Sequence, residues 1–190
     1  MSLSQRRKNK RRKLIFLSVV CSLLTMACGC GYTTRSMISS QYRTVYITPF
    51  TNKIEFIAQS DTGDKYKIYR PHLETDVTKA VIDRYIFDGN LKVVEKDKAD
   101  LILIGGIQEF RRDPLRYDDN DNVTEYRLNM VVNIALWDAK EDRKIWEENG
   151  YTGDFSYFVT GYQAISEDKA VADSIQDLAR RIVERTVEQW

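Results

Sequence analysis

The clearest alternation of apolar and polar side chains in this sequence runs from residue 125 to residue 136. The apolar members of the pattern are Tyr126, Leu128, Met130, Val132, Ile134 and Leu136. The polar members are Glu125, Arg127, Asn129 and Asn133. A period of two predicts a strand whose apolar face covers a core. The short segment "DAKED" (138–142) then leads into 143–158, which predicts a long hairpin.

Two segments instead have the spacing of amphipathic helices. The first begins at Pro71 and ends at Gly89, both of which are typical helix boundaries. Its apolar positions are Leu73, Val77, Ala80, Val81 and Tyr85. The second spans 166–190, and Glu167 and Asp168 suit the positive end of its dipole. Its stripe comprises Val171, Ile175, Leu178, Ile182 and Thr186.

Three further strands are predicted from β-branched and aromatic runs at 43–50, 91–95 and 99–110. The glycine pair at 105–106 suggests a bulge or a close backbone contact. Residues 52–69, with a turn at 61–64, read as a loop. The resulting order, β-α-β-β-β-β-α, predicts a single α+β domain over residues 43–190.

The N-terminus has the pattern of an export signal. Residues 6–13 contain seven basic side chains and no acid, and the apolar run 14–27 follows. Fourteen residues are too few to cross a hydrocarbon core of about 30 Å as a helix. A basic region followed by a short apolar run is typical of a cleaved signal peptide, here residues 1–29.

A cysteine that closes such a run is the acceptor site of a bacterial lipoprotein. Cys30 follows the small residue Gly29 and Cys28 follows Ala27, but the bulkier Met26 makes Cys28 the poorer site. A disulfide between the two cysteines would be strained. We therefore expect a lipid anchor on Cys30, with Cys28 as the alternative, and a polar tether over residues 30–42.

Removal of the signal changes the charge balance. The full chain has 29 Lys plus Arg, and without the seven of the signal 22 oppose 28 Asp plus Glu, a net charge near −6. The one histidine, His72, and the absence of a free cysteine in the mature chain exclude a zinc site or a Cys/His nucleophile. We expect no enzyme, no metal or other cofactor, and no nucleic-acid partner.

Several segments together resemble the LptE family of lipopolysaccharide-assembly lipoproteins. They are "CGCGYTTRS", "VYITPFTN", "YRPHLETDVTKAVIDRYIFDGNLKVV", "ADLILIGGI" and "RRDPLRYDDNDNVTEYRLNMVVNIALWD". The resemblance covers residues 30–190 and rests on the order of segments. It implies a two-layer sandwich in which two helices pack on one face of a four- to five-stranded mixed sheet. It also implies a lipoprotein on the periplasmic side of the outer membrane that plugs the β-barrel protein LptD and helps deliver lipopolysaccharide to the outer leaflet.

Lipopolysaccharide carries phosphates, so an acidic chain needs local basic groups to bind it. Two groups qualify: Arg111, Arg112 and Arg116 around a proline in an expected loop, and Lys65, Lys67 and Arg70. Arginine can bind a phosphate through two hydrogen bonds. The alternative is that these are solvated loop charges balanced by Asp113 and Asp118.

A second interpretation stays open. Parts of the sequence also resemble the small α/β domains of curli-secretion and TolB amino-terminal type, which would make the protein a periplasmic scaffold without a lipid ligand. Under the first interpretation, the long hairpin and the aromatic segment "FSYF" (155–158) are suited to insertion into a larger protein.

Overall fold

The computed structural model describes residues 42–54, 67–68 and 70–188, which all belong to one compact unit spanning residues 36–190. The signal, both candidate lipidation cysteines, Lys65 and the turn at 61–64 lie outside the described residues. The helices of the described part are all too short or too polar to cross a membrane.

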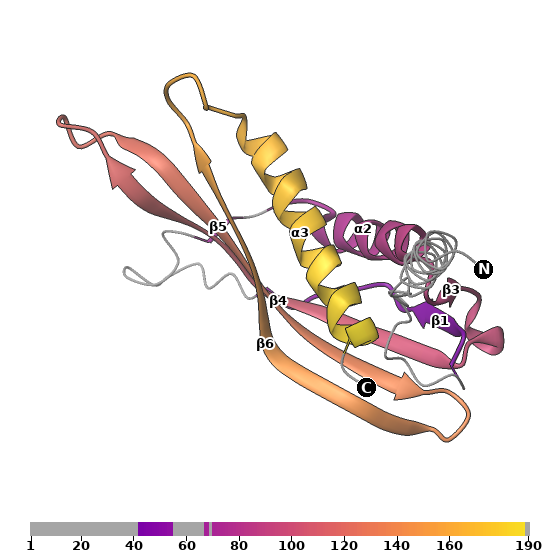
Figure 1. Ribbon diagram of the computed structural model, residues 1–190. Helices are drawn as coiled ribbons and strands as arrows, with labels where there is room; N and C mark the ends of the chain where they lie inside the picture. The colour runs from indigo at the N-terminus through magenta and orange to yellow at the C-terminus, as the bar shows by residue number, and fades with distance from the viewer. Residues whose placement is uncertain (1–41, 55–66, 69, 189–190) are drawn as a thin grey trace, which may run out of the picture. The chain divides into compact units, whose positions relative to one another are not determined.

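The centre of the unit is a mixed sheet (Figure 1). Its strands are β1 (Thr44–Ile47), β2 (Thr51–Asn52), β3 (Lys92–Val93), β4 (Leu101–Tyr117), β5 (Val123–Asp138) and β6 (Arg143–Phe158). The order across the sheet is β3-β1-β4-β5-β6, and β2 also pairs with β4. Pairing is parallel around β1 and β2 and antiparallel from β4 to β6. A short 3-10 turn, Lys96–Lys98, precedes β4.

Two helices, α2 (Leu73–Asp88) and α3 (Glu167–Glu188), cover one face of this sheet (Figure 1). The apolar positions predicted for both helices are buried. Helix α2 ends at Gly89, whose φ of 75° is favourable for glycine and whose N–H bonds to the carbonyl of Tyr85 at 3.0 Å. The α+β fold, with two helices on a mixed sheet, is thereby confirmed.

Strand β5 supplies the middle of the core. The alternation predicted from the sequence is confirmed for Leu128, Met130, Val132, Ile134 and Leu136, all of which are buried, and Tyr126 packs against them half-buried. Arg127 is exposed. Glu125 is buried although it belongs to the polar set, because it pairs across the sheet with Arg116 on β4 and Phe158 on β6.

The prediction that residues 111–116 form a loop was wrong, because β4 continues through them to Tyr117. Pro114 is tolerated because this half of β4 extends beyond β1 and β2. Within the described residues, only an isolated bridge from Lys67 to Arg111 lies on its far side. A proline at such an edge leaves no hydrogen bond unmade. The register shifts directly after it, between Pro114 and Arg116.

Candidate functional site

The three arginines of β4 do not form one cluster. Arg112 lies opposite Leu128 in the register and so shares the helix-covered face. Arg111 lies opposite Asn129 and Arg116 lies opposite Glu125, which places both on the other face. The structure thus separates residues that the sequence grouped together.

Arg112 lies between strand and helix. Its guanidinium lies over the ring of Tyr126, 4.8 Å from the ring centre, and forms an ion pair with Glu167 in the first turn of α3. Burial by itself lowers the pKa of Arg112, but Glu167 and a hydrogen bond to Tyr157 raise it, and the net shift is upward. The side chain therefore remains a cation in a partly apolar setting.

The start of α3 brings the two predicted basic groups together. Arg70, from the second group, bonds Asp168 through its Nη1 at 3.0 Å, next to the Arg112–Glu167 pair. The sequence does not show that these side chains are neighbours, because residues 70, 112 and 168 are far apart along the chain.

A pocket of about 360 Å³ adjoins this cluster. We call it the basic pocket, and it is lined by Lys67, Ile68, Arg112, Pro114, Tyr117, Val123 and Tyr126. Two cationic side chains share the space with apolar and aromatic walls. Such a pocket suits a molecule with an anionic group beside an apolar part.

Arg111 and Arg116 also have carboxylate partners. Arg111 bonds Asp113 at 2.9 Å and lies 3.5 Å from Glu109, and Arg116 Nε lies 2.8 Å from Glu125. The predicted balance with Asp113 is therefore present, whereas Asp118 instead accepts hydrogen bonds from Asn120 and Asn122. The Arg111 pairs are partly exposed and contribute about 0–1 kcal/mol, so a phosphate can replace their carboxylates at little cost. Glu125 is buried, so a phosphate that took Arg116 would leave an unpaired buried carboxylate.

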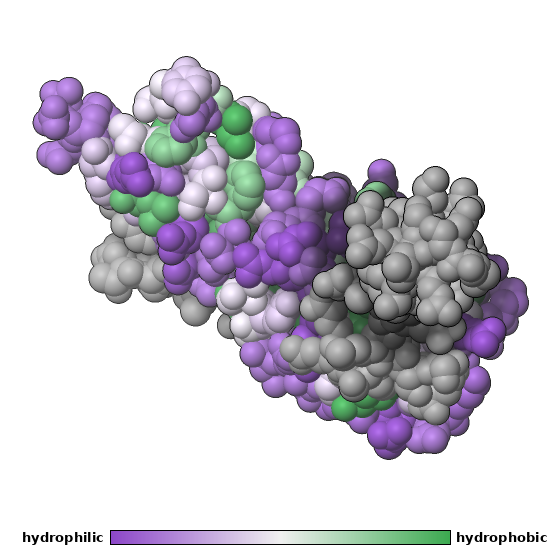
Figure 2. All heavy atoms as spheres, viewed as in Figure 1, coloured by the Kyte–Doolittle hydropathy of each residue, from purple (hydrophilic) through white to green (hydrophobic). Residues whose placement is uncertain are grey.

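Behind the polar β4–β5 turn (118–122), whose protruding end is purple in Figure 2, apolar side chains are exposed near the ends of β4 and β6. We call this surface the apolar tip, and it comprises Leu115, Tyr117, Val159 and Tyr162, the last 96% exposed. The sequence indicates instead that segment 155–158 is suited to insertion. That prediction was wrong in part, because Tyr157 is buried and Phe155 packs against the core. The alternation of β6 predicts such burial once its pairing with β5 is known.

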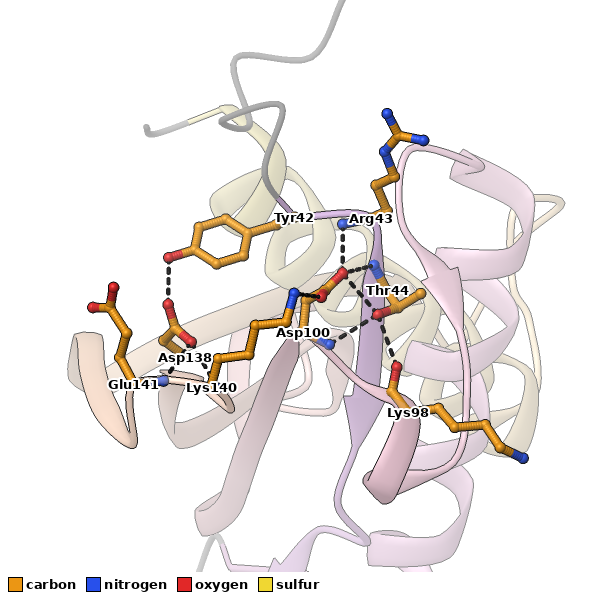
Figure 3. A network of polar contacts seen from close by, with 8 residues as sticks. All are labelled: Tyr42, Arg43, Thr44, Lys98, Asp100, Asp138, Lys140 and Glu141. Carbon is orange, nitrogen blue, oxygen red and sulfur yellow. Dashed lines mark hydrogen bonds and ion pairs between the residues drawn. The ribbon is translucent and has the colours of Figure 1, made fainter.

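The opposite end of β4 and β5 is closed by a network of carboxylates (Figure 3). Asp100 accepts hydrogen bonds from the backbone N–H groups of Arg43 and Thr44, at 2.9 and 3.1 Å, and from the Thr44 hydroxyl. Its other oxygen lies 2.6 Å from Lys140 Nζ. These bonds, Lys140 foremost, lower the pKa of Asp100 to about 2.

Asp138 makes the second connection of this network. It accepts a bond of 2.7 Å from the Tyr42 hydroxyl and two more from the backbone of the β5–β6 turn. The Tyr42 hydrogen bond is the largest of the effects that lower the pKa of Asp138. We call the two aspartates and their partners the carboxylate clasp. It fastens the chain just before β1 to the sheet.

Among the described residues, no three His, Cys, Asp or Glu side chains are placed to hold a metal ion. What these residues do offer is two surfaces, the basic pocket and the apolar tip, at the end of the sheet away from the clasp. These features define the class of the protein as a two-layer α+β domain with two candidate binding surfaces on a long hairpin.

The comparison with protein families gives a more particular result. Residues 42–189 match the model of the family described as LptE, lipopolysaccharide-assembly. The chain belongs to the LptE family. A search of curated proteins found no match.

Several solved structures are similar to this chain at low sequence identity. Protein XCC0632 from Xanthomonas campestris is 12% identical, with a TM-score of 0.51 over 78% of this chain and 88% of the other. The rare lipoprotein B from Shewanella oneidensis is 17% identical, with a TM-score of 0.45 over 74% of this chain and 92% of that protein. A minor lipoprotein from Acinetobacter baumannii is 15% identical, with a TM-score of 0.45 over 77% and 94%.

Proposed function

We propose that this protein is an outer-membrane lipoprotein, anchored through Cys30 with Cys28 as the alternative, that plugs an LptD-type β-barrel and assists delivery of lipopolysaccharide to the outer leaflet. The observation that carries the proposal is the family match over residues 42–189. The family description states lipopolysaccharide assembly, and the barrel partner and the anchor are our extension of it.

The dimensions of the sheet support insertion into a barrel. Strands β4, β5 and β6 contain 17, 16 and 16 residues. At about 3.3 Å per residue, each extends roughly 50 Å, which exceeds the hydrocarbon thickness of a bilayer, about 30 Å. The apolar tip lies at one end of this hairpin, and the clasp, near the predicted tether, lies at the other. A plug that enters tip first would keep its anchored end at the periplasmic side.

The basic pocket supports contact with lipopolysaccharide. Arg112 and Lys67 would face a phosphate, while Ile68 and Pro114 would face an apolar portion of the same molecule. Arg112 must then exchange or share its Glu167 partner. Arg111 and Arg116 lie on the other face, so we expect them to contribute less than Arg112 does.

Purification of the tagged protein from detergent-solubilised outer membrane tests the partner. We expect a β-barrel protein to copurify, and depletion of the lipoprotein to lower barrel abundance and surface lipopolysaccharide together. If no barrel copurifies, and surface lipopolysaccharide is unchanged on depletion, the scaffold interpretation is favoured instead.

Binding of purified lipopolysaccharide tests the pocket. The double variant Arg112→Gln/Lys67→Gln should bind more weakly and with a flatter dependence on salt, because screened phosphate contacts are those that salt removes. Arg127→Gln/Lys79→Gln is the matched control, since it also removes two positive charges, both from exposed side chains outside the pocket. Equal losses in the two variants would show that net charge, and not the pocket, governs binding.

A further inference from the structure

The carboxyl end of α2 carries two large apolar side chains that the fold leaves in solvent. Ile86 is 64% exposed and Phe87 is 80% exposed. They sit one turn after Ile82, which is half-buried, and outside the buried stripe of the same helix. Packing within the described domain therefore gives no reason for their apolar character.

These side chains are held in a defined place. The helix stops at Gly89, and Leu91, two residues later, is buried and fastens the turn to the core. The guanidinium of Arg84 lies 5.2 Å from the centre of the Phe87 ring. The stem of an arginine over an aromatic ring covers apolar area, and the Nε of Arg84 is buried there without a hydrogen-bond partner among the described residues.

Ile86 and Phe87 lie at the end of the domain where its N-terminal strand, β1, begins. Helix α2 leads into β3, which runs parallel to β1, and Lys92 N–H bonds the carbonyl of Arg43 at 2.9 Å. Figure 1 shows this end of α2 beside β3 and β1. Tyr42, the first described residue, is twelve positions after Cys30. An extended chain of that length reaches about 40 Å at most.

The charges at this end are compatible with an anionic lipid surface. Arg43, Lys92 and Lys96 are exposed, and no ion pair joins them to a carboxylate of the described residues. Acidic side chains also lie at this end: Asp97 is exposed next to Lys96, and Glu95 pairs with Lys98. Asp88 accepts hydrogen bonds from Asn90, and Asp83 is exposed one turn before Phe87. The basic side chains can thus face headgroup phosphates around a small apolar contact.

We propose that this end of the domain rests on the bilayer that holds the lipid anchor, with Ile86 and Phe87 inserted among the phospholipid headgroups. The inference rests on the proposed lipid anchor and goes beyond it. A contact of two side chains is weak alone, but a short tether gives it a high effective concentration. The contact orients the domain so that the apolar tip points away from the surface.

The test uses the mature lipoprotein reconstituted into phosphatidylethanolamine and phosphatidylglycerol vesicles. The chain has three cysteines in all, and only Cys30, which is acylated, remains after processing at that residue. A single Asn90→Cys substitution therefore carries an environment-sensitive dye beside Phe87. Tyr162→Cys at the apolar tip is the matched control. The third preparation is Asn90→Cys in an Ile86→Ser/Phe87→Ser background.

We expect the dye at residue 90 to shift to the blue and to be quenched by lipids with shallow nitroxides, while the dye at residue 162 reports water. The Ile86→Ser/Phe87→Ser background should remove the shift without changing thermal unfolding, because both side chains are exposed. A water-like signal at residue 90, or a shift that persists in the double variant, would overturn the inference.

Flotation of the same vesicles separates this result from the proposed function. A protein that floats with the lipid but shows no shift contradicts the surface contact alone. A protein that does not float contradicts the anchor, and the contact with it. A shift seen only when the barrel protein is added identifies a protein surface as the occupant and also overturns the inference.

Discussion

At the scale of single residues, the buried hydroxyl of Tyr85 forms a hydrogen bond that joins the two helices. It donates a hydrogen bond of 2.8 Å to Thr186 Oγ1, which in turn donates to the carbonyl of Ile182 at 2.9 Å. Burial raises the pKa of Tyr85 above its usual range, so the hydroxyl stays protonated and available as a donor. The predicted apolar stripe of α3 included the polar residue Thr186, whose burial is explained by its hydrogen bond with Tyr85.

Tyr85→Phe should lower the free energy of unfolding by about 0.5–1.5 kcal/mol, because it removes one buried hydrogen bond while Thr186 keeps its bond to Ile182. Urea unfolding at neutral pH measures the loss. Tyr162→Phe removes a hydroxyl from a side chain that is 96% exposed and should leave stability unchanged. Similar losses in both variants would contradict the role of the buried pair.

The carboxylate clasp makes stability depend on pH through Asp100. Its pKa is lowered on folding, so its contribution is complete above the unfolded pKa, near 4, and is lost as the pH falls to about 2. The largely buried carboxylate gives up to about 2 kcal/mol, and the exposure of Lys140 reduces this toward about 1 kcal/mol.

Asp100→Asn should therefore lose roughly 1–2 kcal/mol of stability at pH 7 and show a shallower decline between pH 4 and pH 2 than the unsubstituted protein. Unfolding by urea across that range measures the slope. Asp97→Asn, on an exposed residue of the preceding 3-10 turn, should retain the original slope. A variant of Asp100 with the full acid dependence would show that other carboxylates dominate it.

At the scale of elements, β5 was predictable because its period of two is set by local alternation alone. Its inward residues should dominate stability. Met130→Ala or Ile134→Ala should cost about 2–5 kcal/mol, since both side chains are about 1% exposed. Arg127→Ala, on the same strand but exposed, should cost little. Chemical denaturation compares them, and equal costs would mean that the faces of the strand are assigned wrongly.

Gly105 packs closely against the ring of Phe50. A Cβ atom at this position would lie 2.2 Å from Cε1 of Phe50, and the Phe50 ring is buried, so it cannot move aside freely. The close approach that the glycine pair suggested is confirmed. What the sequence could not identify was the partner, 55 positions earlier in the chain.

Gly105→Ala should destabilise the protein by about 1–3 kcal/mol through overpacking. Phe50→Leu shortens the opposing side chain, so the double variant should be more stable than the sum of the single effects predicts. A double-mutant cycle based on urea unfolding measures this coupling. Simple additivity would show that the two residues do not compete for space.

The extent of β4 could not be predicted because it depends on a partner strand. Local propensity reads Pro114 as a break, and the run of charges before it resembles a loop. Pairing with β5 keeps the segment extended. On its other side the described residues contribute only the Lys67–Arg111 bridge, so the missing N–H of Pro114 is harmless there. The pairing with β5 also sends Arg111 and Arg112 to opposite faces. The sequence therefore indicated which basic residues could bind an anion, but not which of them line the basic pocket.

At the scale of the whole domain, the two ends of the sheet have different surfaces. The clasp end holds the entering chain, the exposed apolar pair of α2 and three unpaired basic side chains among the described residues. The far end holds the apolar tip and the basic pocket. If the protein plugs a barrel, substitutions at the two ends should have separable effects.

Tyr117→Ser/Tyr162→Ser should reduce copurification of the barrel protein, because these aromatic side chains are exposed on the domain alone and would be buried in a surrounding wall. Thermal unfolding of the isolated lipoprotein should not change. The matched variant Ile86→Ser/Phe87→Ser removes similar exposed apolar area from the other end and should leave copurification near its original level.

If the α2 variant instead lost the barrel and the tip variant kept it, the domain would have to enter in the reverse orientation, with its anchored end leading. Because a tether of twelve residues reaches only about 40 Å, that orientation would leave little chain to return to the periplasmic leaflet. The pair of variants therefore tests the direction of insertion as well as the partner.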